Sequence, residues 1–264
     1  EARRTHGEWR RVDALAPGMR VELSTVTALD SRRDAAAEDE AALVGWLHGD
    51  GFVGQYEQGT NRSLTVEFMT INKDEFHFVQ ERIQRVFPEV HFHVRSVETQ
   101  TPGLEVRRIR LYGEVLRPFV EKYDLLRGPK EDVTISPGLR LAGREVQAAY
   151  LRALFQADGT VRLRSRRSRT SDVVLTTVSP QLARDVQALL LNLGIYARVQ
   201  RGTETRSNRR VPYFVSVGYA DARNRFRELI GFVSEEKRSK LDRACSTDYP
   251  GKRLPGLREE TILR

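Results

Sequence analysis

A stretch of nine residues constrains this chain more than any other, because the chain comes close to repeating it. Residues 43–51 read LVGWLHGDG, and residues 151–159 read LRALFQADG. Each copy is expected to form a short apolar helix that ends at Asp-Gly, with small residues four positions apart that let two helix backbones approach closely. If the two helices pack on each other, Asp50 and Asp158 lie together at one end of the pair.

Two aspartates at helix C-termini indicate a bound cation. The end of a helix carries partial negative charge from its free carbonyls, so a carboxylate there is unfavourable unless a cation neutralises it. Carboxylate and carbonyl oxygens, with room left for water and phosphate, suit Mg²⁺. The alternative is that Asp-Gly only ends a helix and begins a turn. That alternative is preferable for one copy, and the cation is preferable for two matched copies.

The repetition extends well beyond the motif. Residues of matching type recur at a constant interval of 107 positions, as in Ile71 and Val178, Tyr112 and Tyr219, Phe119 and Phe226, and Lys130 and Lys237. The motif aspartates are 108 positions apart, which a one-residue difference in length after the motif explains. The sequence therefore predicts a tandem duplication.

Hydrophobic periodicity and turn residues give both repeats the order αββαββα. We expect an α+β fold in which each repeat has a four-stranded antiparallel sheet with helices on one face, and in which the two motif helices pack together. Asn72 with Glu75, and Ser179 before Pro180, mark helix starts. The expected divisions are an extension at 1–37, a first repeat at 38–140, a second repeat at 141–245 and a tail at 246–264.

Composition places the chain among globular proteins, with 39% hydrophobic and 30% charged residues. A single cysteine, Cys245, rules out an internal disulfide framework and a cysteine-based zinc site. No apolar run is long enough to cross a bilayer, and no signal peptide opens the chain. We therefore expect no membrane partner and an intracellular location, in the cytoplasm or nucleoid.

The net charge favours a nucleic-acid partner. Lys and Arg total 44 against 36 for Asp and Glu, giving a formal charge of +8. Arg, Asn and Gln can contact base edges, and β-ribbons fit the major groove of double-stranded DNA. The alternative is a solvated polar sheet face. The candidates on or beside the open faces are Gln55, Gln58, Asn61, Arg62, His93, Arg95, Arg107, Arg108 and Arg110 in the first repeat, and Arg162, Arg164, Arg166, Arg167, Arg169, Arg198, Arg201, Arg209 and Arg210 in the second.

With motif, duplication and basic strands together, residues 38–245 resemble a single-chain LAGLIDADG homing endonuclease. The residues that keep the family motif are Leu43, Gly45, Asp50 and Gly51 in the first copy, and Leu151, Leu154, Ala157, Asp158 and Gly159 in the second. His48 and Gln156 replace an aspartate that is not a metal ligand in that family. We expect His48 to have a supporting or packing role rather than to bind metal.

The resemblance implies a monomeric, Mg²⁺- or Mn²⁺-dependent DNA endonuclease that makes double-strand cuts at a specific site and leaves four-base 3′ overhangs. Asp50 and Asp158, helped by the carbonyls of Gly49 and Ala157, would hold the ions. Lys237 and Lys130 would position or activate solvent, and Lys130 has the less typical surroundings. The alternative is a LAGLIDADG protein that binds nucleic acid without cutting, such as an RNA maturase or a DNA-binding regulator. The retained Asp50, Asp158 and Lys237 favour the enzyme.

Residues 5–23 resemble a segment of an intein, the part just downstream of its Thr-x-x-His block. No Cys or Ser stands at position 1, and no His-Asn pair ends the sequence. We therefore expect these residues to lack self-splicing and to be the endonuclease part of a larger intein.

Overall fold

The computed structural model describes residues 11–14, 16, 34–55, 63–98, 105–126, 128–163, 170–204 and 210–246. After the short 3-10 turn η1 (Val12–Ala14), the first repeat contains α1 (Ala35–Asp50), β1 (Gly51–Gly54), β2 (Thr65–Thr70), α2 (Lys73–Val86), β3 (Phe92–Val97), β4 (Val106–Tyr112), η2 (Glu114–Leu116) and α3 (Arg117–Lys122). The 3-10 turn η3 (Lys130–Asp132) and α4 (Pro137–Arg140) lead to the second repeat. That repeat contains α5 (Arg144–Asp158), β5 (Gly159–Arg162), β6 (Asp172–Thr177), α6 (Pro180–Asn192), β7 (Arg198–Arg201), β8 (Tyr213–Val217), α7 (Ala220–Leu229) and α8 (Glu235–Cys245).

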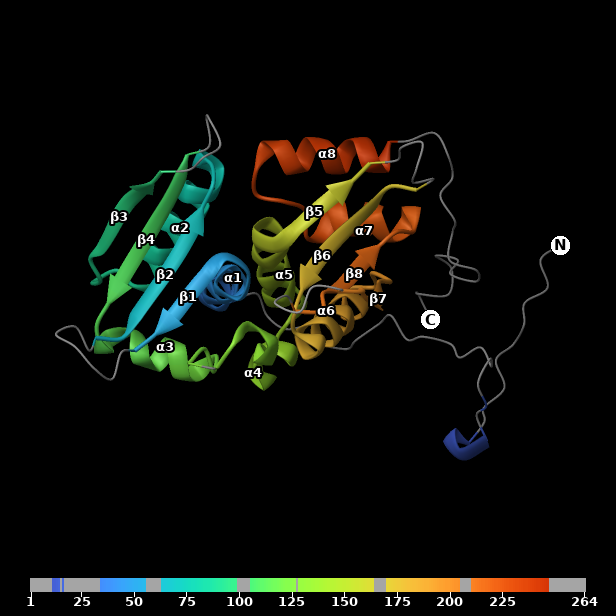
Figure 1. Ribbon diagram of the computed structural model, residues 1–264, viewed down its shortest axis with the longest axis horizontal. Helices are drawn as coiled ribbons and strands as arrows, with labels where there is room; N and C mark the ends of the chain where they lie inside the picture. Colours follow the sequence, from blue (N-terminus) through green and yellow to red (C-terminus); the bar gives the residue numbers. More distant parts are fainter. Residues whose placement is uncertain are drawn as a thin grey trace.

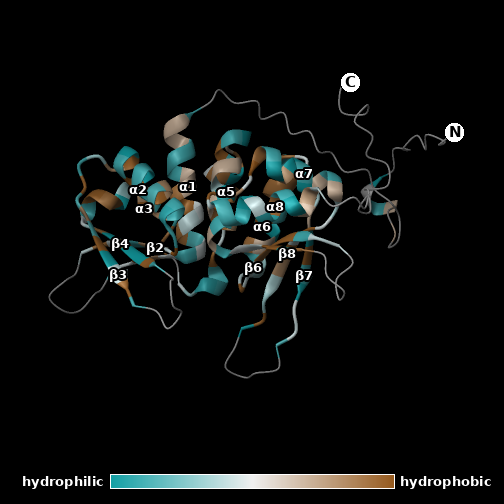
Figure 2. Cartoon of the chain, turned by 90° about the horizontal axis from the view of Figure 1, so that it is seen from above, coloured by the Kyte–Doolittle hydropathy of each residue, from teal (hydrophilic) through white to brown (hydrophobic). Residues whose placement is uncertain are grey.

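Two four-stranded antiparallel sheets form the frame of the molecule, which confirms the predicted α+β fold. Their strand orders are β1-β2-β4-β3 and β5-β6-β8-β7. Helices α1 and α5 lie side by side between the sheets (Figure 1). Figure 2 shows both sheets on one side of the molecule and the helices on the other. One face of each sheet is thus left uncovered, and the two uncovered faces lie on the same side.

Small residues let α1 and α5 approach as closely as the motif predicts. A β-carbon at position 45 would overlap the carbonyl oxygen of Tyr150, and one at position 49 would lie 2.5 Å from the β-carbon of Ala157. Both glycines are therefore required at the contact. Every residue from 41 to 47 in α1 is buried, because this helix packs on α5, on α2 and on β2.

The predicted helix starts are largely confirmed. The side chain of Ser179 accepts a hydrogen bond from the Leu182 amide at 3.0 Å, and Asn72 Oδ1 accepts one from the Glu75 amide at 2.9 Å. The other half of the capping box differs, because the Glu75 carboxylate accepts from the Ile71 amide rather than from that of Asn72. α8 was not predicted. It has few apolar positions, and of its residues only Leu241 and Ala244 are buried.

Within the described part of the chain, no helix is long and apolar enough to cross a membrane. The predicted divisions at 37/38, 140/141 and 245/246 stay predictions. Most of the intein-like segment 5–23 lies outside the described residues.

Candidate active site

The structure brings the two motif aspartates to the same end of the helix pair. Asp50 is the last residue of α1, and Asp158 is the last residue of α5. A β-carbon at position 49 would lie 3.5 Å from Cγ of Asp158, so the Asp158 carboxyl group sits against the backbone just before Asp50. Directly after each aspartate the chain enters the first strand of a sheet, β1 after Asp50 and β5 after Asp158. Both carboxyl groups therefore stand where a helix end meets a sheet.

Desolvation raises the pKa of both carboxyl groups. It raises the pKa of Asp158 to about 6, and the negative charge of Asp50 adds to that rise. Desolvation also raises the pKa of Asp50. Lys130 and Lys237 oppose both rises through their positive charge. Asp158 remains accessible to solvent, so water screens part of the repulsion between the two carboxylates.

One lysine from each repeat completes the cluster. The Nζ atom of Lys130, in η3, donates to the Gly49 carbonyl at 2.9 Å. The Nζ atom of Lys237, in α8, donates to the Gly159 carbonyl at 2.8 Å and to the Gln156 carbonyl. Burial lowers the pKa of Lys237, while Glu75, Asp50 and Asp158 raise it. The four residues proposed for catalysis thus lie together around the ends of α1 and α5.

The donor set fits a divalent cation. Asp50 and Asp158 supply hard carboxylate oxygens whose mutual repulsion a cation would relieve. Among the described residues, no group of three or more His, Cys, Asp or Glu side chains could hold a metal. A bound ion would therefore need backbone carbonyls, water or substrate oxygens as well. Of the carbonyls proposed as ligands, that of Gly49 accepts from Lys130.

The two residues that replace the usual first aspartate of the motif have unlike surroundings. Nδ1 of His48 shares a hydrogen bond of 2.8 Å with the hydroxyl of Tyr150. Gln156 is 1% exposed, and its side chain hydrogen-bonds to Glu75 and Ser234. The sequence marked Gln156 only as a departure from the motif, because its partners Glu75 and Ser234 lie far from it along the chain. The one available signal was the buried, charged Glu75, whose counterpart 107 positions later is the apolar Leu182.

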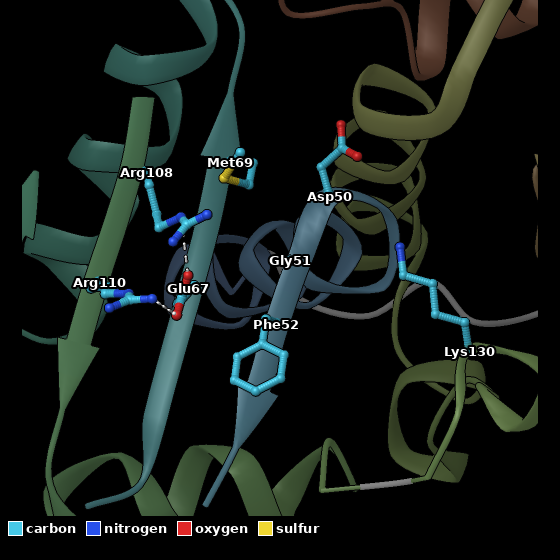
Figure 3. A pocket seen from close by; sticks show the side chains of 8 residues that line it. All are labelled: Asp50, Gly51, Phe52, Glu67, Met69, Arg108, Arg110 and Lys130. Atoms are coloured by element: carbon cyan, nitrogen blue, oxygen red, sulfur yellow. Dashed lines mark ion pairs between the residues drawn. The ribbon is translucent and has the colours of Figure 1, made fainter. Parts of the chain in front are cut away.

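The open face of the first sheet carries arginines that flank a carboxylate. Glu67 in β2 lies 2.7 Å from Arg110 and 3.4 Å from Arg108, both in β4. Strand pairing places Arg95 beside Arg108 and His93 beside Arg110. Figure 3 shows the ion pairs on the same side of the sheet as Phe52. Glu67 was not predicted, because only cationic and amide residues were considered for this face.

A pocket of about 410 Å³ joins this face to the proposed catalytic centre. Its lining residues are Asp50, Gly51, Phe52, Glu67, Met69, Arg108, Arg110 and Lys130 (Figure 3). The Phe52 side chain is 44% exposed, which makes it an apolar surface within a polar pocket. A ligand that spans the pocket would therefore touch both Asp50 and the arginines.

Two arginines placed on the open faces by the sequence lie on the helix-facing side instead. The Arg107 guanidinium sits 4.7 Å from the ring centre of Phe76 in α2. Arg201 pairs with Tyr213 and shares the side of Val199, opposite to Arg198. Successive residues of a strand alternate between faces. Arg107 and Arg108 therefore could not both lie on the open face.

Among the residues that the structure describes, the second sheet presents a less charged face. Arg162 makes two hydrogen bonds to Asp172, at 3.0 and 2.8 Å. Arg198 and Gln200 are exposed in β7, and Gln200 was not among the predicted residues. By strand alternation and register, the centre of this face is formed by Val174, Thr176, Phe214 and Ser216.

The remaining candidates fall into two groups. Near the ends of the strands, Gln55 hydrogen-bonds to Glu114 and Arg117, and Arg210 pairs with Glu131 at 2.5 Å. The predicted contacts that lie outside the described residues are Gln58, Asn61, Arg62, Arg164, Arg166, Arg167, Arg169 and Arg209.

Comparison with known proteins identifies the fold to which this architecture belongs. Residues 145–231 match the LAGLIDADG-like domain. The crystal structure of I-DmoI in complex with DNA and Ca aligns with a TM-score of 0.55 and 17% sequence identity, over 78% of this chain and 98% of that one. The chain has the LAGLIDADG fold.

Other proteins are similar to this chain in structure or in sequence. The N-terminal LAGLIDADG domain of DUF199/WhiA aligns with a TM-score of 0.52 and 12% identity, over 82% of this chain and 91% of that one. In sequence, the replicative DNA helicase DnaB of Rhodothermus marinus is 30% identical over 91% of this chain and 25% of its own length. The replication factor C small subunit of Methanocaldococcus jannaschii is 24% identical over 92% of this chain and 12% of its own length. This chain thus spans a quarter or less of these two relatives.

Proposed function

We propose that this protein is a site-specific DNA endonuclease that cuts both strands of a long double-stranded site. The observation that carries the proposal is the cluster of Asp50, Asp158, Lys130 and Lys237. Two of its members, Asp50 and Lys130, line a pocket together with Arg108 and Arg110 of the first sheet. The fold adds support, because I-DmoI is a homing endonuclease whose structure has been solved in complex with DNA.

In the proposed reaction, the two sheets bind the duplex and the helix ends face the scissile phosphates. Arg108, Arg110, Arg162 and Arg198 would contact phosphates or base edges. Asp50 and Asp158 would hold divalent cations, Mg²⁺ or Mn²⁺, with the carbonyls of Gly49 and Ala157 as further ligands. When bound, such ions stabilise charge on the phosphate and lower the pKa of an attacking water.

The lysines have a separate part in this mechanism. Lys130 and Lys237 stand beside the carboxylates, and each donates a hydrogen bond to a carbonyl at a helix end. An ammonium group held there can hydrogen-bond a water molecule beside the phosphate and offset the negative charge that develops on it. We propose one cut per strand, leaving four-base 3′ overhangs.

A randomised DNA library tests the activity directly. Purified protein is incubated with long randomised duplexes and Mg²⁺, and the ends of the cut molecules are sequenced. We expect a single long site with unlike half-sites, because the described residues of the first sheet present a charged face and those of the second an uncharged centre. Products with random ends, or equal yields with and without EDTA, would contradict the proposal.

The match to the LAGLIDADG domain of DUF199/WhiA supports a second candidate, which is a nucleic-acid-binding protein that does not cut. Under this alternative the library would yield bound but intact duplexes. The paired carboxylates favour the nuclease, since a purely binding protein gains nothing from two desolvated aspartates, one of which raises the pKa of the other.

We further propose that the nuclease is a segment embedded in a larger protein. The DnaB and replication factor C relatives have different names and functions, yet each matches nearly all of this chain over a small share of its own length. A homologous segment inside otherwise different proteins is typical of an inserted element. Sequencing of the gene on both sides tests this, with a continuous reading frame expected and flanking stop codons contradicting it.

A further inference from the structure

Gln156 joins three elements from both repeats through its side chain. Its amide nitrogen donates to Glu75 of α2 at 2.6 Å and to the Ser234 hydroxyl at 3.1 Å. Its amide oxygen accepts from the backbone amides of Val233 and Ser234, at 2.9 and 3.1 Å. Both hydrogens and both lone pairs of the amide are thus used, in a position that is 1% exposed.

The partners of Gln156 fix the start of α8. Ser234 is the N-cap of this helix, and it hydrogen-bonds to Gln156 through both its backbone and its hydroxyl. A second link comes from Asp74, whose carboxylate accepts from the Glu235 amide at 2.9 Å. The first turn of α8 is therefore tied to the N-terminal end of α2, which belongs to the other repeat.

Lys237 stands in that first turn, and its side chain returns to Gln156. Its Nζ atom donates to the main-chain carbonyls of Gln156 and Gly159. The Gln156 side chain thus holds the helix that carries Lys237, while the Gln156 carbonyl holds the amine. We call the cluster of Glu75, Gln156 and Ser234 the cross-repeat clamp.

Among the described residues, the first repeat has no counterpart of the cross-repeat clamp. Lys130 lies on a three-residue 3-10 turn and is exposed. His48, the counterpart of Gln156, hydrogen-bonds to Tyr150 within the helix pair, and Leu182 takes the place of Glu75. The two proposed catalytic lysines are therefore held in different ways.

We propose that Gln156 is a positioning residue that, with Glu75 and Ser234, fixes the Nζ atom of Lys237 at the active site. This role rests on the proposed nuclease function, in which Lys237 acts beside a scissile phosphate. The cross-repeat clamp also makes one lysine depend on the correct docking of the two repeats, because Glu75 belongs to the first and Lys237 to the second.

Exchanging the amide and the carboxylate between positions 156 and 75 tests the cross-repeat clamp. In Gln156→Glu, the donor to Glu75 is lost and two carboxylates meet in a buried place. Adding Glu75→Gln restores the pair of one amide and one carboxylate, with the amide now at position 75 and the carboxylate at position 156. The amide oxygen at position 75 can still accept from the Ile71 amide. We expect the single variant to release α8 and the double variant to restore it.

Two readouts are measured on the same proteins. The first is the labelling rate of Lys237 by an amine-reactive reagent in metal-free protein, followed by mass spectrometry. The second is the cutting rate of each strand of a doubly labelled duplex. We expect Gln156→Glu to raise the labelling of Lys237 and to slow the same strand that Lys237→Met slows, by about 10²-fold. In the double variant, both the labelling rate of Lys237 and the cutting rate of that strand should return most of the way to the wild-type values.

Gln147→Glu is the matched control. Gln147 is also 1% exposed and lies on the same helix, but its amide donates to the carbonyls of Arg140 and Ala142 near the opposite end. We expect this variant to lower Tm without changing the labelling of Lys237 or the ratio of strand cuts. If Gln156→Glu is unfolded, Glu75→Gln alone, which sets two amide donors against each other, serves as the milder disruption.

The outcomes separate the clamp from the nuclease proposal. Equal effects of Gln156→Glu and Gln147→Glu on Lys237 labelling would overturn the clamp, as would a folded double variant that recovers neither readout. If labelling follows the expected pattern but the wild-type protein cuts no DNA, the clamp stands and the nuclease proposal fails.

Discussion

Two carboxyl groups that repel each other dominate the proposed active site at the scale of single residues. Desolvation and Asp50 together raise the pKa of Asp158 to about 6, and Lys130 and Lys237 oppose only part of this rise. The motif predicted that the aspartates would meet. Their electrostatic environment depends on lysines that lie far away in sequence, so it could be obtained only from the folded chain.

Substitution of Asp158 should therefore change stability in a pH-dependent way. The folded pKa of about 6 exceeds the ordinary value of 3.8, so ionisation destabilises the folded state as pH rises through this window. In metal-free protein, Asp158→Asn should match the wild type below about pH 4 and be more stable above pH 6. Because the side chain is solvent-accessible, we expect the two proteins to differ in free energy of unfolding by at most about 1 kcal/mol. Thermal melts across pH measure the difference, and a variant that is less stable at pH 7 would contradict the assignment.

Glu67 should restrain DNA binding by the first sheet. It pairs with Arg108 and Arg110 on the open face, so Glu67→Gln frees two guanidinium groups for phosphate. We expect tighter binding to DNA of unrelated sequence and a salt dependence steeper by about one ion. Glu105→Gln changes the net charge equally but frees Arg107, which stacks on Phe76. This control should bind as the wild type does. Equal gains in DNA affinity in both variants would show that the effect comes from net charge alone.

At the scale of secondary structure, local patterns predicted the elements whose signals are strong. The motif helices, the strands and the starts at Asn72 and Ser179 follow from periodicity and capping residues. α8 was missed because most of its side chains face solvent, so it lacks an apolar stripe. The misplacement of Arg107 and Arg201 came from grouping residues by type along a strand, whereas the alternation of faces depends on each residue's position.

Close packing of the motif helices should make Gly45 sensitive to substitution. A β-carbon there would overlap the backbone of Tyr150, and a backbone atom on a packed helix has little freedom to move. Despite the higher helix propensity of alanine, Gly45→Ala should lower the free energy of unfolding by about 2 kcal/mol. Urea denaturation measures this. Gly138→Ala, where nothing lies within 4 Å, should stay within about 0.5 kcal/mol of the wild type, and equal losses at both sites would contradict the packing argument.

At the scale of the whole molecule, a tandem repeat has become two unlike halves. The interval of 107 residues predicted the duplication and brought Lys130 into line with Lys237. It could not show that Lys237 is held by the cross-repeat clamp while Lys130 lies on an exposed turn, because the clamp depends on Glu75, Gln156 and Ser234 meeting in space. Nor could it show that the first sheet carries Arg108, Glu67 and Arg110 where the described part of the second has an uncharged centre. These differences suit an asymmetric DNA site.

The central claim is that Asp50 and Asp158 form a phosphodiesterase centre. The most direct measurement compares wild type, Asp50→Asn and Asp158→Asn on the selected DNA site, with cleavage measured in Mg²⁺ and binding measured in Ca²⁺. We predict that both variants bind DNA as the wild type does but cut at least about 10²-fold more slowly, while the wild type leaves four-base 3′ overhangs. Equal cutting by all three proteins would contradict the account.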